Sequence, residues 1–256
     1  MKLGFIGTGK ITSSVVTGIC GSKISFKNII VSPRNRSTAQ KLKKKFRKVL
    51  IAKNNQEIVN SCNWIFLALT PAVGQKIIKN LKFKSNQTII SFISTMTLPQ
   101  LKRAIKAKST IVRAIPLPPI SLKKGPVPLF PPNKKVKIFF DKLGTSLEIK
   151  NEKLSLNFWS LSSMMAPFYE ILNILANWLI KKGIKKQDAQ KYITSLFLAL
   201  SADAVNQSSK SLENLVKNSQ TPKGLNQQAL NELRKAGFFK HLVGTSNSIL
   251  KRLKKA

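Results

Sequence analysis

The N-terminal end of the chain places two glycines where a predicted strand turns into a predicted helix. Leu3–Ile6 is an apolar run typical of a buried strand, Gly7-Thr8-Gly9 follows it, and Lys10–Cys20 has a helical pattern. Gly7 permits a tight turn, and Gly9 lets the backbone approach a bound group closely. The first N–H groups of the helix then point at an anion. The spacing predicts a cradle for the paired phosphates of a dinucleotide, with Thr12 at the usual third small position. The predicted contacts from this turn are Ile6, Gly7, Thr8, Gly9, Lys10 and Ile11.

A second candidate site follows the next predicted strand, which ends at Ser32-Pro33-Arg34-Asn35-Arg36. NAD-specific folds place an acid at this point for the ribose 2′-hydroxyl, whereas NADP-specific folds place an Arg for the 2′-phosphate. This segment has no acid and holds two of the seven arginines of the chain. We therefore expect Ser32, Arg34 and Arg36 to form a 2′-phosphate pocket, with NADPH preferred over NADH. A solvated basic loop is the alternative.

The fourth predicted strand, Trp64–Leu69, ends in Thr70-Pro71. Ligands of such sheets bind at the carboxyl ends of the strands, so we expect Thr70 and Pro71 near the nicotinamide ribose or the diphosphate. An ordinary turn with Pro71 at the first helical position accounts for this spacing equally well.

Several catalytic classes are excluded by residue type. His241 is the only histidine, the nine acids are dispersed, and no cysteines and histidines have zinc spacing. General acid–base chemistry would have to come from hydroxyls, amides, water or the substrate itself. No metal site is expected.

A possible carboxylate site lies near the C-terminal end, where Gln220-Thr221-Pro222-Lys223-Gly224-Leu225-Asn226 is predicted to open a helix. Thr221 would be the N-cap and Pro222 would lie in the first turn. The N–H groups of such a helix start can hold a carboxylate, although an ordinary helix cap explains the pattern as well.

The elements that position these residues alternate between strand and helix over the first part of the chain, which implies a parallel sheet with helices on both faces. The expected strands are Leu3–Ile6, Ile29–Ser32, Val49–Ile51, Trp64–Leu69, Thr88–Phe92, Ile111–Arg113 and Ser146–Ile149. The expected helices are Lys10–Cys20, Thr38–Arg47, Gln56–Ser61, Val73–Leu81, Pro99–Ile105 and Lys134–Leu143. The prolines of 116–132 are not expected inside helices or central strands.

From about Asn151 only helices are expected: Phe168–Lys182, Gln187–Ser208, Pro222–Lys235 and Phe238–Lys254. The first two are apolar on too many faces for an isolated pair, which indicates a partner subunit. The predicted domains are therefore 1–150 and 151–256.

The formal net charge of +36 raises the possibility of nucleic-acid binding. However, 38 of the 45 basic residues are Lys, they are spread over the whole length, and no aromatic residues alternate with them. We expect only nonspecific, salt-sensitive adhesion. We expect no membrane span, because no apolar run is long enough, and no signal peptide before the first strand. The two cysteines favour a reduced, cytoplasmic protein.

Taken together, five segments resemble pyrroline-5-carboxylate reductase over nearly the whole chain. They are Gly4–Ile11, the stretch from Asn54 to Pro71, Arg113-Ala114-Ile115-Pro116, Ala166-Pro167-Phe168-Tyr169, and Thr221–Asn226 followed by Ala236-Gly237-Phe238. The resemblance implies an α/β fold, with an N-terminal Rossmann-like NADP-binding domain followed by an all-α dimerisation and substrate domain.

The resemblance also implies hydride transfer from NAD(P)H to 1-pyrroline-5-carboxylate, giving proline, in a homodimer or larger homo-oligomer. It extends the cofactor residues to Asn55, Ala68 and Leu69. It puts the substrate carboxylate of the cyclic imine against Gly224, Leu225 and Asn226, with Asn226 as the catalytic hydrogen-bond donor.

This chain departs from the family pattern mainly on the substrate side. The family's Lys before Pro is Thr70, its Asn after Met-Pro is Leu117, and its Ser-Gly-Ser-Gly run before the later Pro is Ser163-Met164-Met165-Ala166. Met164 and Met165 would narrow a pocket that glycines keep open. A reductase of a different imine or carbonyl acid, and a non-enzymatic binder of NADP or nucleic acid, are therefore rival hypotheses.

Overall fold

The computed structural model describes residues 1–209 and 211–255 and divides into two compact units, Met1–Trp159 and Ser160–Lys255. The first unit combines a sheet with helices, and the second is helical. The predicted α/β part followed by an all-helical part is thereby confirmed. Helix α7 (Glu152–Leu161) begins within the first unit, whereas the sequence placed the domain boundary near residue 150.

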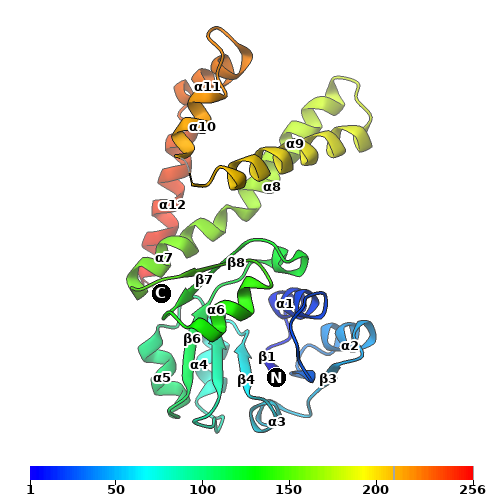
Figure 1. Ribbon diagram of the computed structural model, residues 1–256, viewed down its shortest axis with the longest axis vertical. Helices are drawn as coiled ribbons and strands as arrows, with labels where there is room; N and C mark the ends of the chain where they lie inside the picture. Colours follow the sequence, from blue (N-terminus) through cyan, green and yellow to red (C-terminus); the bar gives the residue numbers. More distant parts are fainter. Residues whose placement is uncertain (210, 256) are drawn as a thin grey trace. The chain divides into compact units, whose positions relative to one another are not determined.

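The first unit is built on an eight-stranded sheet with the order β3-β2-β1-β4-β5-β6-β7-β8 (Figure 1). β1 to β6 are parallel, β7 runs antiparallel to β6, and β8 runs parallel to β7. The strands are β1 (Lys2–Ile6), β2 (Asn28–Val31), β3 (Val49–Ile51), β4 (Trp64–Leu67), β5 (Thr88–Ser91), β6 (Thr110–Ala114), β7 (Pro126–Phe130) and β8 (Thr145–Glu148).

Helices cover both faces of this sheet, because the central strands are predominantly apolar and send alternate side chains to opposite sides. Phe5 belongs to one buried cluster and its neighbour Ile6 to the other. The first cluster joins the sheet to α1 (Lys10–Cys20), α2 (Arg36–Lys45), α6 (Lys134–Asp141) and the 3₁₀ turn η1 (Pro118–Leu122). The second joins it to α3 (Asn55–Ser61), α4 (Pro71–Ile78) and α5 (Leu98–Ile105).

An aromatic stack holds the two strands that flank the predicted cradle. The rings of Phe5 on β1 and Phe66 on β4 lie parallel, with centroids 4.4 Å apart, and both side chains are fully buried. Such pairs stabilise the fold by about 1 kcal/mol beyond the burial of their area. The stack therefore stiffens the sheet directly below the β1–α1 turn.

Strand β7 corrects the expectation that the proline-rich segment stays outside central strands. Pro126 and Pro128 lie within β7, which has a neighbour on each side. Leu129 accepts a hydrogen bond from Ile149 on the β8 side, so Pro128 faces the β6 side. The β6–β7 pairing covers only Phe130 and Leu129, so β6 has ended before it reaches the prolines. Their missing N–H groups therefore remove no ladder hydrogen bond.

The second unit consists of α8 (Met165–Lys181), α9 (Lys186–Asn206), α10 (Leu212–Asn218), α11 (Leu225–Lys235) and α12 (Phe238–Lys255), preceded by a short 3₁₀ turn, η2 (Ser162–Met164). Helix α10 was not expected. Helices α8 and α9 form an antiparallel hairpin in which the rings of Phe168 and Phe197 meet edge to face (Figure 1).

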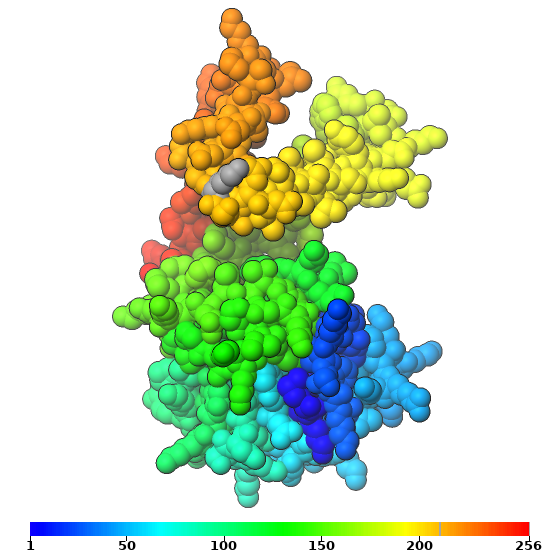
Figure 2. All heavy atoms as spheres, viewed as in Figure 1, coloured from blue at the N-terminus to red at the C-terminus, as the bar shows by residue number. Residues whose placement is uncertain are grey.

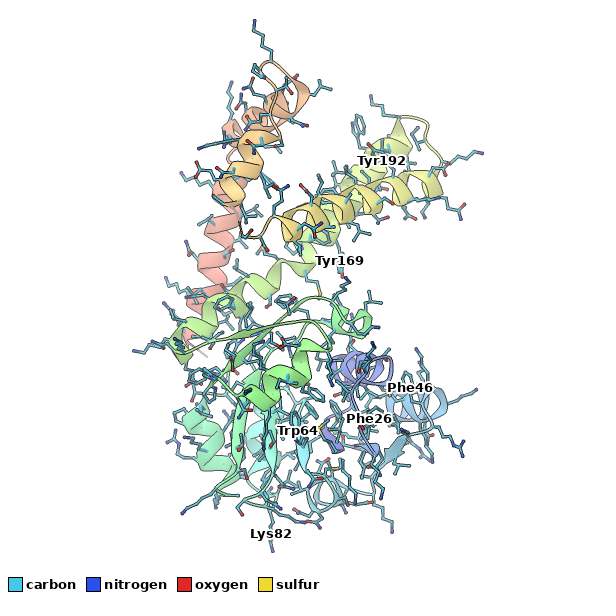
Figure 3. All side chains as sticks on the ribbon, in the orientation of Figure 1. Phe26, Phe46, Trp64, Lys82, Tyr169 and Tyr192 are labelled. Atoms are coloured by element: carbon cyan, nitrogen blue, oxygen red, sulfur yellow. The ribbon has the colours of Figure 1, made fainter. Side chains whose placement is uncertain are left out.

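Much apolar surface of the second unit is open to solvent. On the face that Figure 2 draws, no other layer of protein lies in front of the α8–α9 hairpin, in yellow tones, or of α10–α11, in orange. Tyr169 and Tyr192 on this hairpin, labelled in Figure 3, are 52% and 61% exposed. Further exposed apolar side chains on the hairpin are Ile174 (57%), Trp178 (57%), Leu198 (72%) and Leu200 (59%).

Within the described residues, no helix combines the length and the apolar character needed to cross a membrane. In the same part of the chain, no three His, Cys, Asp or Glu side chains lie close enough together to hold a metal ion.

Candidate functional site

The turn between β1 and α1 adopts a conformation that requires glycine at Gly7. Its φ is +99°, and a Cβ built there would lie 2.2 Å from the carbonyl oxygen of Ala68. The N–H of Ala68 in turn donates to the Ile6 carbonyl at 2.8 Å. The end of β1 therefore packs directly against the segment that follows β4, and the structure brings these two predicted cofactor segments together.

Three hydroxyl groups hold this turn in place. Thr8 Oγ1 donates to the Ser32 carbonyl at 2.6 Å, and Ser32 Oγ accepts from the Gly7 N–H at 3.1 Å. The two hydroxyls also lie 3.1 Å apart, and because the Thr8 proton is already used, Ser32 is the donor there. Thr12 Oγ1 closes the turn from the helix side by donating to the Gly7 carbonyl at 2.6 Å.

The hydroxyl network changes the interpretation of two residues. Ser32 is 1% exposed and uses its hydroxyl inside the protein, so its side chain supports the turn rather than facing a 2′-phosphate. Thr12, which replaces the third small residue of the glycine pattern, is fully buried and supplies a hydrogen bond that glycine or alanine lacks. The sequence pattern alone did not reveal this supporting role.

The start of α1 is open in the way an anion requires. Gly9 is its N-cap, and no side chain of the described residues caps the helix. A Cβ built on Gly9 would meet no described atom within 4 Å apart from its neighbours in the chain, so the space beside Gly9 is open. The first N–H groups of a helix have no partner within it and carry a partial positive charge. Gly9, Lys10 and Ile11 therefore fit the diphosphate of a dinucleotide.

The basic residues after β2 lie at the surface. Arg34 and Arg36 are both exposed, and Asn35 between them accepts the Thr38 N–H at 3.2 Å and so caps α2. Because β1 and β2 are parallel neighbours, their carboxyl ends meet at the same edge. The segment that carries both arginines therefore follows the strand next to the β1–α1 turn.

The remaining predicted cofactor residues lie at the same edge of the sheet. Thr70 is the N-cap of α4 and Pro71 its first residue, and the Thr70 side chain makes no cap hydrogen bond. Leu69 is half-buried beside the Gly7 turn. Asn55 begins α3 after β3, which β2 separates from β1. Asn55 is thus the most distant member of the predicted set within the order of the sheet.

The structure corrects the predicted helix start near the C-terminal end. Gly224, not Thr221, is the N-cap of α11, and the helix begins at Leu225. Thr221–Gly224 forms a separate turn closed by a 2.8 Å hydrogen bond from the Gly224 N–H to the Thr221 carbonyl, with Lys223 at φ +59°. Pro at the second position and a positive φ at the third define a type II turn, which ends the chain reversal before the helix starts.

Of the three residues predicted to contact the substrate, Gly224 is the N-cap of α11, and the other two have different environments. The Leu225 side chain is 85% exposed. Asn226 Nδ2 donates to the Ser219 carbonyl at 2.8 Å, at the end of α10. One of its two amide protons therefore links α11 to α10, and the other remains for a ligand.

Sequence reasoning missed a buried ion pair at the carboxyl end of β6. Arg113 is 1% exposed and pairs with Glu152, whose side chain is 23% exposed. The guanidinium carbon also lies 4.1 Å from the ring centroid of Trp159. Burial lowers the pKa of Arg113, and the charge and hydrogen bond of Glu152 partly restore it. In the sequence Arg113 stood out only as part of a segment that resembles the family, and nothing marked Glu152 as its partner, since the two are 39 residues apart.

A cavity of about 390 Å³ lies at the opposite edge of the sheet, where β1 and β4 begin. It is lined by Met1, Ile24, Ser25, Trp64, Lys135, Ile138, Phe139 and Lys142. Trp64 is labelled in Figure 3. These residues offer no acid and no activated nucleophile, so we assign the chemistry to the carboxyl edge.

Two family profiles match the chain. Residues 2–95 match the family described as NADP oxidoreductase coenzyme F420-dependent. Residues 157–256 match the family described as pyrroline-5-carboxylate reductase dimerisation. The first match contains the β1–α1 turn, and the second contains the helical unit.

Individual proteins similar to this chain are also named pyrroline-5-carboxylate or pyrroline carboxylate reductases. The chain is 29% identical to pyrroline-5-carboxylate reductase 3 of Danio rerio over 128 residues, which are 49% of this chain and 44% of that protein. It is 23% identical to pyrroline-5-carboxylate reductase of Staphylococcus saprophyticus over 91% of this chain and 89% of that protein. A crystal structure of Plasmodium falciparum pyrroline carboxylate reductase with NADP bound superposes with a TM-score of 0.85 at 21% identity, covering 100% of this chain and 97% of the other.

Proposed function

The chain belongs to the pyrroline-5-carboxylate reductase family, and from that premise we propose that it reduces 1-pyrroline-5-carboxylate to proline with a nicotinamide dinucleotide. The observation that carries the proposal is the open, uncapped start of α1 behind a glycine turn held by three hydroxyls. This geometry supports diphosphate binding through backbone N–H groups rather than through long flexible side chains.

We propose NADPH as the preferred form of the cofactor. Ser32 is occupied by the turn, which leaves Arg34 and Arg36 as the groups that would meet a 2′-phosphate. No Asp or Glu follows β2 to accept hydrogen bonds from a free 2′-hydroxyl. An arginine contact to a phosphate is charge-assisted and can be bidentate, which favours NADPH over NADH.

The proposed mechanism relies on positioning. When bound, the cofactor supplies the hydride, and the cyclic imine is already electrophilic once its nitrogen is protonated. Backbone N–H groups at the start of α1 would hold the diphosphate, and Ala68, Leu69, Thr70 and Pro71 would border the nicotinamide half. Gly224, Leu225 and Asn226 at the start of α11 would face the substrate carboxylate, with the free amide proton of Asn226 as a donor. Holding two reactants in contact contributes much of the rate in such a site.

We also propose that the protein is a homo-oligomer that pairs through its second unit. The exposed apolar side chains of the α8–α9 hairpin are too many and too large for a monomeric surface. The match of residues 157–256 to a dimerisation family supports pairing through this unit.

A direct assay tests the proposed activity. Purified protein is mixed with 1-pyrroline-5-carboxylate and either NADPH or NADH, and the loss of absorbance of the reduced cofactor is followed. We expect turnover with both cofactors and a higher kcat/KM with NADPH. Binding of NADPH by calorimetry without any turnover of this imine would refute the proposed substrate.

One observation favours a second candidate, reduction of a related imine with a larger apolar body. Leu225 presents an almost fully exposed apolar side chain at the predicted carboxylate site, and Met164 and Met165 replace smaller family residues. A panel of cyclic imines of increasing size distinguishes the two candidates, because the second requires a higher kcat/KM for the larger substrates.

A further inference from the structure

The buried pair of Arg113 and Glu152 contacts two points along the connection from β5 to α5, at the carboxyl edge of the sheet. Arg113 Nη2 donates to the Ser94 carbonyl at 2.7 Å. Glu152 Oε1 accepts the Leu98 N–H at 2.7 Å and also contacts Arg113 Nη1. The connection from β5 to α5 spans residues 92–97. The ion pair therefore links Ser94 within this connection to Leu98, the first residue of α5, and the segment between them is called the Ser94–Leu98 loop below.

The position of this loop gives the pair a functional meaning. β1, β4 and β5 are adjacent and parallel, so the turns after them lie side by side at the edge where ligands bind. The dinucleotide's diphosphate is assigned to the turn after β1, and its adenosine end to the segment after β2. The loop after β5 therefore lies on the nicotinamide side, next to Leu69 and Thr70 after β4.

Arg113 and Glu152 differ from an ordinary surface ion pair, because the arginine is almost completely buried. Trp159 stacks on the guanidinium and is 5% exposed, so Arg113 is enclosed between the sheet and α7. Replacing such a pair by apolar residues is often neutral for stability, so stability alone does not account for the pair. The pair instead fixes the positions of the Ser94 carbonyl and the Leu98 N–H, two backbone groups at the edge where a ligand binds.

We propose that Arg113 and Glu152 are positioning residues, which fix the Ser94–Leu98 loop so that the site accepts the nicotinamide half of the cofactor. The inference rests on the proposed function, because it needs a nicotinamide dinucleotide at this edge. Neither residue touches the cofactor itself. Each acts through the backbone of the loop.

The test compares a whole cofactor with a fragment of it. NADPH extends across both halves of the site, whereas 2′,5′-ADP fills only the adenosine half. The double variant Arg113→Met with Glu152→Leu removes both loop anchors and leaves no unpaired buried charge. We expect its Kd for NADPH to rise about tenfold while its Kd for 2′,5′-ADP stays within about twofold. The amides of Ser94–Leu98 should exchange with deuterium faster.

Two single variants keep the test valid if the double variant does not fold. Glu152→Gln retains an oxygen for the Leu98 N–H and should bind NADPH almost as well as the unaltered protein, even if it melts earlier. Arg113→Lys keeps a positive charge but loses the fork that reaches both Glu152 and Ser94, so it should lose affinity for NADPH relative to 2′,5′-ADP. The control, Lys137→Gln with Asp141→Asn, neutralises an exposed pair on α6 and should change neither affinity.

Opposite results would overturn the inference. Equal loss of NADPH and 2′,5′-ADP affinity would show a general effect on the unit, and unchanged NADPH affinity with faster amide exchange would show a loop that the cofactor does not sense. A chain that binds NADPH without reducing the imine refutes only the proposed function. A chain that binds neither nicotinamide cofactor refutes both.

Discussion

At the scale of single residues, the two glycines of the β1–α1 turn have separable roles. Gly7 is required by the protein itself, because its φ is positive and any Cβ at that position would lie 2.2 Å from the Ala68 carbonyl oxygen. Gly9 has ordinary extended angles and open space beside it, so only a bound diphosphate would exclude a side chain there.

The first prediction contrasts these glycines. Gly9→Ala should fold, with a loss of about 1 kcal/mol or less, but weaken NADPH binding by roughly tenfold or more, because its methyl group occupies the diphosphate position. Gly7→Ala should lose about 3 kcal/mol or more of stability. Urea unfolding and calorimetric titration measure both effects. If Gly9→Ala binds NADPH as tightly as the unaltered protein, the diphosphate does not bind at this turn.

The second prediction separates Ser32 from the arginines that follow it. Because Ser32 supports the turn, Ser32→Ala should weaken NADPH and NADH by the same factor. The Arg34→Ala and Arg36→Ala variants should weaken NADPH alone, by about 1.5–3 kcal/mol for a lost charged hydrogen bond. Measuring kcat/KM with each cofactor gives the ratio. If Ser32→Ala changes the ratio of kcat/KM for NADPH to that for NADH, the Ser32 hydroxyl contacts the 2′-phosphate and the prediction is wrong.

The third prediction concerns the two cysteines, which stay protonated at neutral pH. Burial raises the pKa of Cys20 and of Cys62 to about 11, with nearby Lys48 and Lys2 respectively opposing the shift. Since the thiolate is the reactive form, alkylation by iodoacetamide should be slow at pH 8 and accelerate towards pH 11. Urea-unfolded protein, whose thiol pKa returns to about 8.5, serves as the control. Fast alkylation of the folded protein at pH 8 would contradict the burial of these thiols.

At the scale of elements, the helices at the carboxyl edge of the sheet begin in two different ways. Helix α5 has a complete capping box, in which Thr97 accepts the Gln100 N–H and Gln100 accepts the Thr97 N–H. Helices α1 and α4 begin without any side-chain cap. The two uncapped starts are assigned to the diphosphate and to the nicotinamide half of the cofactor. Helices α2 and α3 at the same edge have asparagine caps, Asn35 and Asn54, and α5 is the helix whose preceding loop the ion pair contacts.

The fourth prediction compares Thr97 with Thr70, since both are N-caps before a proline-containing first turn. Thr97→Ala should destabilise the protein by about 1 kcal/mol, because it breaks a capping box. Thr70→Ala removes no cap hydrogen bond and should leave the free energy of unfolding within about 0.5 kcal/mol. Denaturant unfolding of the two variants measures the difference, and equal losses would contradict the assignment of the caps.

At the scale of the whole molecule, the two units differ in how they bury apolar residues. Two clusters on opposite faces of the sheet make the first unit self-sufficient. In the second unit, Ala176, Ala189 and Ile193 are the buried apolar residues among those described, while many larger side chains are exposed. A partner copy therefore completes the core of the second unit in our proposal.

The fifth prediction tests this pairing. Leu198→Asp with Leu200→Asp places charges at two exposed apolar positions on different sides of α9 and should convert the oligomer to monomer in sedimentation velocity experiments. Leu122→Asp is the matched control, because Leu122 is equally exposed, at 70%, but lies on η1 in the first unit. Its sedimentation should be unchanged. If the control variant dissociates, or if the α9 variant does not, the subunit interface does not lie on the α8–α9 hairpin.

Local sequence patterns determined much of the fold. Apolar runs of four or five residues between amphipathic helices predict a parallel sheet, because strands covered on both faces have no polar side. The strand–glycine–helix pattern located the candidate cradle for the same reason, since Gly7, Gly9 and the first turn of α1 are neighbours in the chain. These features depend on contacts within about a dozen residues, so the sequence carries them directly.

Only the tertiary structure decided the contacts between distant segments. In the structure the Ser32 hydroxyl contacts the Thr8 hydroxyl, and α11 begins at Leu225. Pro128 lies in β7 at a position that β6 does not reach. The structure also pairs Arg113 with Glu152 across 39 residues. Residue types state which bonds a side chain can make, but packing decides which partner is within about 3 Å and shielded from water. The helical unit illustrates the same difference. The periodicity of the sequence indicated that its helices have apolar faces beyond what one pair can bury, but only the structure shows which of these side chains the rest of the chain leaves exposed.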